Sequence, residues 1–171
     1  MERARVHGVH ASSTAAKITV TGVPDHATAA VLRVVAEQGV VPGMVSRNPA
    51  GPVAVAFTVD RSAGPVVLAA LGAARDRIGF RTVDLDDNVA VVMLTGAGLR
   101  ADPVVPATFC EVLAREGVRL GLVSFDNARI SATCGGHEAE ATVRALREVF
   151  EVGRGVPTSR GWWRPSATIG R

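Results

Sequence analysis

Short runs of alternating hydrophobic and polar or small residues follow one another along this chain, separated by stretches of helical periodicity. Residues 53–59 place Val, Val, Phe and Val at every second position, which is typical of a strand with one buried face. The spacing of Val31, Leu32, Val35 and Ala36 instead brings apolar side chains to one side of a helix. Over the first half the pattern predicts strand, helix, strand, strand, helix, strand.

The predicted elements fall into two halves of similar order. The first half is predicted to contain strands 17–22, 41–47, 53–59 and 81–85, a helix that follows Asp25 and ends at Gly39, and a helix over 66–77. Thr28 or Asp25 is expected to cap the first of these helices. The second half is predicted to contain strands 90–96, 118–124 and 129–134 and helices 106–116 and 138–149.

An internal duplication underlies this similarity, because residues 34–46 can be laid without gaps over residues 112–124. The second half lacks a strand after its last helix. The alternating segment 4–10 is the candidate for the missing strand, followed by a Ser/Thr/Ala linker over 11–16. We therefore expect the first unit to be inserted within the second. The expected division is 17–88 for the first unit, 4–10 plus 89–152 for the second, and a Gly/Pro/Arg/Trp-rich tail over 153–171.

Composition excludes several classes of protein. The net charge is only +3 and the arginines are scattered, so no basic patch for nucleic acid is expected. No apolar run approaches the length of about 20 residues that spans a membrane. Cys110 and Cys134 have no C-x-x-C spacing and no histidine at metal-ligand distance, which indicates reduced thiols in a cytoplasmic protein. We expect neither a metal nor a cofactor.

Several motifs occur in a characteristic order and spacing. They are Val-His-Gly-Val at 6–9, Ala-Lys-Ile-Thr-Val-Thr-Gly-Val-Pro-Asp at 16–25, Asp-Asp at 86–87, Leu-Thr-Gly-Ala-Gly-Leu-Arg at 94–100, Pro-Ala-Thr-Phe-Cys at 106–110, Arg-Ile-Ser at 129–131 and Glu-Val-Phe at 148–150. The series resembles the regulatory part of aspartate kinases, a tandem pair of ACT domains. It is most similar to the separate small regulatory subunit of some bacteria.

The resemblance implies an α+β fold of two ferredoxin-like βαββαβ (ACT) units, with antiparallel sheets and helices on one face of each sheet. It also implies a homodimer that holds a small amino-acid ligand, with a catalytic kinase subunit as a candidate partner. In such a unit the turn before the first helix offers N–H groups to a carboxylate, and the edge of the second strand offers groups to the rest of the ligand. The implied ligand positions are Asp25, His26, Ala27, Thr28, Met44, Arg47, Asn48, Asp102, Pro103, Val104, Ser124, Phe125, Asp126 and Asn127.

This sequence departs from the family pattern mainly at those positions. The family's Asp-x-Pro-Gly reads Asp-His-Ala-Thr at 25–28, and its second Pro-Gly reads Pro-Val at 103–104. An acidic residue of the family is replaced by Gly43 and Gly121, and Arg47 stands in place of a glutamine. A β-branched residue in place of glycine reshapes a pocket. Lysine and threonine are therefore not expected to be strong effectors.

Two functions remain open at the level of sequence. The chain has no room for an amino-acid kinase domain and contains neither that family's Lys-x-Gly-Gly stretch nor a Walker-type loop. One hypothesis is a ligand-sensing regulatory module that signals to a catalytic partner. The alternative is a free-standing ACT pair repurposed in a biosynthetic pathway, including as an enzyme, with His26, Asp102 and Asp126 as the acid–base candidates. Trp162 and Trp163 in the tail are expected to dock on protein.

Overall fold

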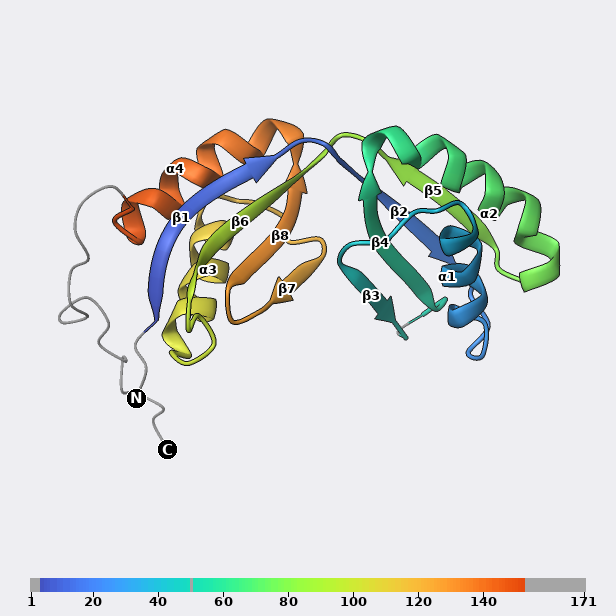
Figure 1. Cartoon of the computed structure of the whole chain (residues 1–171), viewed down its shortest axis with the longest axis horizontal. Helices are drawn as coiled ribbons and strands as arrows, with labels where there is room; N and C mark the ends of the chain where they lie inside the picture. Colours follow the sequence, from blue (N-terminus) through green and yellow to red (C-terminus); the bar gives the residue numbers. More distant parts are fainter. Residues whose placement is uncertain (1–3, 50, 153–171) are drawn as a thin grey trace.

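The computed structural model describes residues 4–49 and 51–152 and contains two four-stranded antiparallel sheets (Figure 1). One sheet has the strand order β3-β4-β2-β5 and the other has the order β1-β6-β8-β7. Two helices cover one face of each sheet. The predicted α+β class with two ferredoxin-like units is confirmed. The expected docking of Trp162 and Trp163 lies outside the described residues.

The first unit follows the predicted order of elements. It consists of β2 (Ala15–Thr21), α1 (Thr28–Glu37), β3 (Val45–Asn48), β4 (Ala54–Asp60), the 3₁₀ turn η1 (Arg61–Ala63), α2 (Gly64–Ile78) and β5 (Thr82–Asp86). The alternation in β4 buries Val55, Phe57 and Val59. In α1, Val34 is buried whereas Ala36 is exposed, so the apolar face is rotated slightly from the predicted one. Ile18 and Leu71 complete the centre of this core.

The second unit repeats this order and begins with the strand nearest the N-terminus. It consists of β1 (Arg5–Ser12), β6 (Val89–Ala97), α3 (Val104–Arg115), β7 (Val123–Phe125), β8 (Arg129–Gly135), the 3₁₀ turn η2 (Gly136–Glu138) and α4 (Ala139–Val149). Its core is built around Leu94, Phe109, Ile130 and Leu146, all fully buried. Each unit therefore has its own hydrophobic core.

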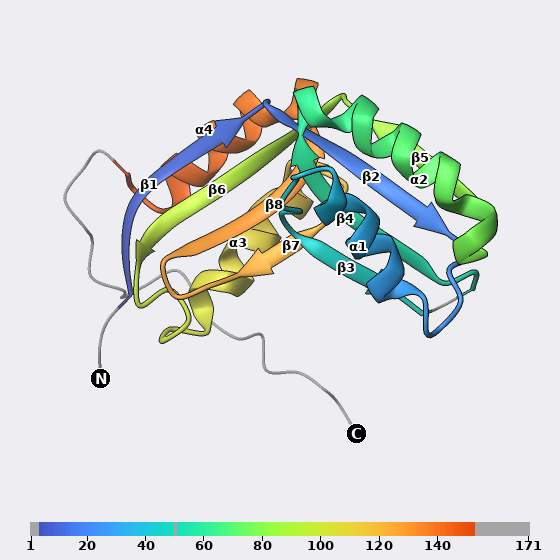
Figure 2. The same ribbon diagram turned by 45° about the vertical axis from the view of Figure 1, so that its right-hand side comes forward.

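The strand β1 pairs with β6, which lies alongside it in both views (Figures 1 and 2). The antiparallel register runs from Arg5 opposite Ala97 to Ser12 opposite Val91, with an irregularity between Val6 and Gly8. The segment 4–10 thus contributes to the sheet of β6, β7 and β8. On this basis we propose to divide the chain into the units 17–88 and 4–10 plus 89–152.

The predicted linker over residues 11–16 is wrong. The strand β1 continues to Ser12 and β2 begins at Ala15, so the connection has only two residues. Ala11 pairs with Val92, and Ala16 is fully buried opposite Val59. The small residues at 11–16 resemble a linker in sequence, but most of them belong to paired strands.

The second strand of each unit starts later than predicted, at Val45 in β3 and Val123 in β7. Before each start, a glycine N–H donates to a threonine carbonyl of the neighbouring strand, Gly43 to Thr58 at 2.7 Å and Gly121 to Thr133 at 3.3 Å. A Cβ at either glycine would collide with the hydroxyl oxygen of that threonine. The duplicated glycines therefore leave space for a buried threonine, and regular pairing begins only after them.

Arg147 of α4 anchors the open edge of β1. Its Nε and Nη2 groups donate hydrogen bonds of 3.1 and 2.9 Å to the carbonyl oxygen of Val9. Val9 itself is fully buried, so this carbonyl has few alternatives to the arginine.

We expect Arg147→Ala to lower the free energy of unfolding by about 1 kcal/mol, because a buried carbonyl loses a charge-assisted partner. The matched control is Arg144→Ala on the same helix, since Arg144 makes no hydrogen bond or ion pair within residues 4–49 and 51–152. Urea denaturation of both variants measures the difference. Equal effects would show that Arg147 does not hold β1.

Candidate functional site

The loop between β2 and α1 is held in place by its backbone. Gly22 has a φ of +68°, and a Cβ there would lie 2.7 Å from the Cβ of Arg81, so only glycine fits. The N–H of Val23 donates to the carbonyl of Val53 at 3.1 Å, and the N–H of Ala27 donates to that of Pro24 at 2.9 Å. These bonds fix the turn and leave the side chains of Asp25 and His26 exposed at its tip.

The start of α1 carries no side-chain cap, so the prediction that Thr28 or Asp25 caps this helix is wrong. The N-cap position is Ala27, which cannot accept a hydrogen bond through its side chain. The first-turn N–H groups consequently receive no side-chain acceptor. Within residues 4–49 and 51–152, Thr28 Oγ1 is the one buried side-chain oxygen or nitrogen without a hydrogen-bond partner. Such an unsatisfied group carries a desolvation penalty of about 1–3 kcal/mol.

An ion pair connects this loop to the edge of β3. The Nη2 of Arg47 lies 2.6 Å from Oδ1 of Asp25, which brings two predicted ligand residues together. The side chain of Asp25 is 88% exposed and that of Arg47 is 34% exposed, so the pair contributes at most about 1 kcal/mol to stability. A ligand could therefore displace it at little cost. His26 is exposed beside it, and the carbonyl of Met44 accepts the N–H of Thr58 at 3.3 Å.

In the corresponding loop of the second unit, side chains of the unit itself accept hydrogen bonds from the backbone. Oδ1 of Asp102 accepts the N–H of Val104 at 3.0 Å, at the first residue of α3. The N–H of Leu99 donates to the carbonyl of Asn127 at 2.9 Å, which joins this loop to the turn between β7 and β8. In that turn, Oδ1 of Asp126 accepts the N–H of Ala128 at 2.9 Å. Both predicted carboxylates thus bind the backbone of their own loops.

The acid–base candidates do not form one cluster. His26 belongs to the first unit, whereas Asp102 and Asp126 belong to the second. In the described part of the chain, no hydrogen bond or ion pair joins any two of them. The remaining predicted positions lie at the start of α3 and on β7, where Pro103, Ser124 and Phe125 are exposed, and at the end of β3, where Asn48 pairs with Ala54.

Neither cysteine is suited to act as a nucleophile at neutral pH. Both are free thiols. Burial, together with the nearby charge of Glu138, raises the pKa of Cys134 to about 11, and burial with Glu111 raises the pKa of Cys110. Both thiols stay protonated near pH 7, and the thiolate is the reactive form.

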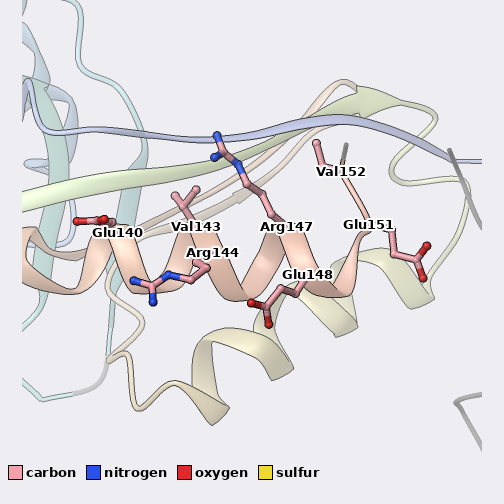
Figure 3. A pocket seen from close by; sticks show the side chains of 7 residues that line it. All are labelled: Glu140, Val143, Arg144, Arg147, Glu148, Glu151 and Val152. Carbon is pink, nitrogen blue, oxygen red and sulfur yellow. The ribbon is translucent and has the colours of Figure 1, made fainter. Parts of the chain in front are cut away.

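A groove that sequence analysis did not identify runs along α4 and has a volume of about 780 Å³ (Figure 3). It is lined by Glu140, Val143, Arg144, Arg147, Glu148, Glu151 and Val152. Figure 3 shows Arg147 directed toward β1, whereas Arg144 and Glu148 point to the side of α3. The signal for this surface was the charged spacing of three and four residues along α4, which is also typical of a solvated helix face.

Residues 4–49 and 51–152 contain no group of three or more His, Cys, Asp and Glu side chains that could hold a metal ion. None of their helices is both long and apolar enough to cross a membrane.

Comparison with known proteins gives a consistent set of relatives. No family model matches the chain. The aspartokinase of Mycobacterium tuberculosis is 39% identical over 159 residues, which are 90% of this chain and 38% of that protein. The chain therefore spans about two fifths of the length of such relatives.

Two solved structures match this chain over nearly their whole length. A structure of aspartokinase alpha and beta subunits has a TM-score of 0.81 and 30% identity, covering 86% of this chain and 99% of that one. The ligand-free regulatory subunit of aspartate kinase from Thermus thermophilus has a TM-score of 0.79 and 31% identity, covering 85% of this chain and 98% of that one.

We expect Thr28→Val to leave the ligand-free protein equally stable or more stable by up to about 1 kcal/mol, because it removes a buried hydroxyl that has no partner. The matched control is Thr142→Val in α4, since Thr142 Oγ1 donates to the carbonyl of Glu138 at 2.7 Å. That variant should lose about 1 kcal/mol. Chemical denaturation measures both, and a destabilised Thr28→Val would mean that the hydroxyl has a partner in solution.

Proposed function

Because this chain belongs to the family of aspartate kinase regulatory subunits, we propose that it is a regulatory module that binds a small amino-acid-like carboxylate at the start of α1. Binding at this loop would be passed to a catalytic partner. The proposal rests on the resemblance of the whole chain and on the open start of this helix.

The observation that carries the site is the unsatisfied start of α1. The N-terminus of a helix attracts a carboxylate because its N–H groups and the helix dipole both favour negative charge. Here no side chain caps the helix, and the hydroxyl of Thr28 is buried without a partner. A ligand carboxylate would accept from the N–H groups and from this hydroxyl. The Asp25–Arg47 pair then stands beside it as a donor and an acceptor for the rest of the ligand.

The two units differ in this respect, so we propose one ligand site per chain at these loops. In the second unit, Asp102 already supplies a carboxylate to the start of α3. A ligand there would have to displace a neighbouring side chain of the same charge. The first unit has no such internal competitor at the helix start.

The ligand selectivity of this site should differ from that of a site for lysine or threonine. Arg47 lies 2.6 Å from Asp25 and so competes for the carboxylate that a ligand's ammonium group would use. Thr28 also adds a branched side chain where the family pattern has glycine, which reduces the room for the ligand. The site therefore favours a small ligand whose binding depends on its carboxylate.

The partner is proposed to be an aspartate kinase catalytic chain. One similar structure is that of aspartokinase alpha and beta subunits. The alternative, a repurposed ACT pair with enzymatic activity, has less support because Asp102 and Asp126 bind backbone N–H groups and neither contacts His26 in the described residues.

Thermal melts test the ligand site. A ligand that binds only the folded state stabilises it by about 2.7 kcal/mol at a hundredfold excess over Kd, which raises the melting temperature of a chain of this size by roughly 5–10 °C. We expect millimolar concentrations of a small amino acid to produce such a shift, with lysine and threonine among the weakest of the panel. Thr28→Val should reduce the shift by about half or more, because the loss of one charge-assisted hydrogen bond weakens binding by roughly tenfold.

Asp102→Asn is the matched control for this experiment, because it changes the equivalent loop of the second unit. It should leave the shift intact. Strong stabilisation by lysine or threonine would contradict the proposed selectivity. A wild-type protein that responds to no amino acid, in the presence or absence of the aspartate kinase catalytic chain from the same genome, would remove the proposed function.

A homodimer is the expected assembly, and the exposed apolar side chains support it. The exposed Val45 and Phe125 lie in the edge strands β3 and β7, and the exposed Val41 and Leu120 precede these strands in the chain. An unpaired edge with apolar side chains is a surface that pairs readily with another chain.

Sedimentation should give twice the mass of the chain for the wild type and the mass of one chain for the double variant Val45→Glu with Phe125→Glu. Buried carboxylates at the edges would oppose strand pairing. Val66→Glu is the control, because Val66 is 54% exposed on α2, away from both edges. A monomeric wild type at micromolar concentration would contradict the assembly.

A further inference from the structure

The groove along α4 begins where the described chain continues into the tail, residues 153–171. Val152 is the last described residue and also part of the groove lining. Its N–H donates to the carbonyl of Arg147 at 3.1 Å, and Glu151 before it has a φ of +48°. This arrangement is that of a Schellman turn, which ends a helix with one residue in the left-handed conformation. The tail therefore starts at the groove itself.

The carboxylates of this groove have no cation beside them. Glu140, Glu148 and Glu151 are exposed, and their carboxylates make no hydrogen bond or ion pair within residues 4–49 and 51–152. Glu148 lies in the last turn of α4 and Glu151 follows that helix, where the helix dipole disfavours negative charge. Arg147 of the same turn is directed toward β1 and donates to Val9 instead (Figure 3). This end of the groove therefore favours a cationic occupant.

The composition of the tail is complementary to the groove. The tail contains no Asp or Glu and four arginines, which are Arg154, Arg160, Arg164 and Arg171. It also contains both tryptophans of the sequence, Trp162 and Trp163. Val143 and Val152 are half-buried in the lining, and a volume of about 780 Å³ is in the range that encloses a drug-sized molecule. The groove thus offers an apolar surface for indole rings next to carboxylates for arginines.

The tail is long enough for this contact. Nine residues separate Val152 from Trp162, and an extended chain advances by up to about 3.3–3.6 Å per residue. The helix α4 has 11 residues and is therefore about 16 Å long. The tryptophans can reach every part of the groove. Attachment at Val152 also gives the tail an effective concentration on the order of millimolar at this surface, so weak contacts suffice.

We propose that the tail folds back onto α4 of the same chain, with Trp162 and Trp163 on the apolar part of the groove and the arginines beside its carboxylates. Burial of the two indole rings supplies most of the stabilisation, because exposed ion pairs contribute little. The docked tail covers the helix whose Arg147 holds β1, so it shields the contact that completes the second sheet. The contact does not involve the loop before α1 and is independent of the proposed function.

Tryptophan fluorescence tests this proposal on the chain of residues 1–171. The sequence has two tryptophans and no tyrosine, so the emission reports on the tail alone. We expect the native chain to emit at a shorter wavelength than the urea-denatured chain. Its acrylamide quenching constant should be lower by about twofold or more, because one face of each ring is covered.

The double variant Glu148→Lys with Glu151→Lys should release the tail. The docking equilibrium should fall by roughly tenfold, because two attractive contacts become repulsive. Both fluorescence readouts should then move toward the values of the denatured chain. Lysine at this end of α4 complements the helix dipole, so the double variant should stay folded, and circular dichroism checks this.

Glu37→Lys is the matched control. Glu37 is likewise exposed at the C-terminal end of a helix, makes no ion pair among the described residues and lies in the first unit. The fluorescence of this variant should equal that of the wild type. A red shift as large as that of the double variant would mean that general charge, and not the groove, holds the tail.

Three outcomes would overturn the proposal. The first is long-wavelength, freely quenched emission from the native wild-type chain. The second is equal fluorescence of the wild type and the folded double variant, which would mean that the tryptophans are buried away from this groove. The third concerns the double variant refolded together with a Trp162→Ser, Trp163→Ser chain. Recovery of short-wavelength emission in that mixture would place the tail on the groove of a second copy.

Discussion

The antiparallel pairing of β1 with β6 determines how the chain is arranged. Without β1 the second sheet would have three strands and would expose the edge of β6 to solvent. Because β1 precedes the first unit in the chain and pairs within the second, two connections must cross between the units. Both are short, residues 13–14 and 87–88. This closeness places Lys17 and Asp86 in the lining of one cavity together with Arg119, His137 and Glu138 of the second unit.

The two repeats share their framework and differ in their loops for a physical reason. Gly43 and Gly121 each make room for a buried threonine, so a change at either glycine would disturb a strand pair and its core. Apart from Gly22, which is fixed by its positive φ and its contact with Arg81, the loops before α1 and α3 have diverged. Asp102 satisfies the start of α3, whereas the start of α1 has no side-chain cap. The two units have thus kept the same fold, whereas their helix starts differ in whether a side chain accepts from the backbone.

The sequence predicted most of the fold, because alternation and duplication report directly on which positions are buried. It misjudged residues 11–16, where small residues pair across a tight junction, and the caps of α1, where the helix begins without a side-chain acceptor. The contact of Asp25 with Arg47 involves two residues that motif comparison had named separately. The cavity lined by Lys17, Asp86, Arg119 and Glu138 combines residues far apart in the sequence, so it became visible only after the strands were paired.

A regulatory module must convert ligand binding into a change that a partner can detect, and a ligand shifts an equilibrium only by its difference in affinity for the two states. The proposed loop site at α1 lies within one unit, so binding there would change the stability of that unit without fixing its neighbour. Two short connections join that unit to the second one. Binding at α1 would therefore reach a partner only as far as the partner distinguishes the bound from the unbound state of the first unit.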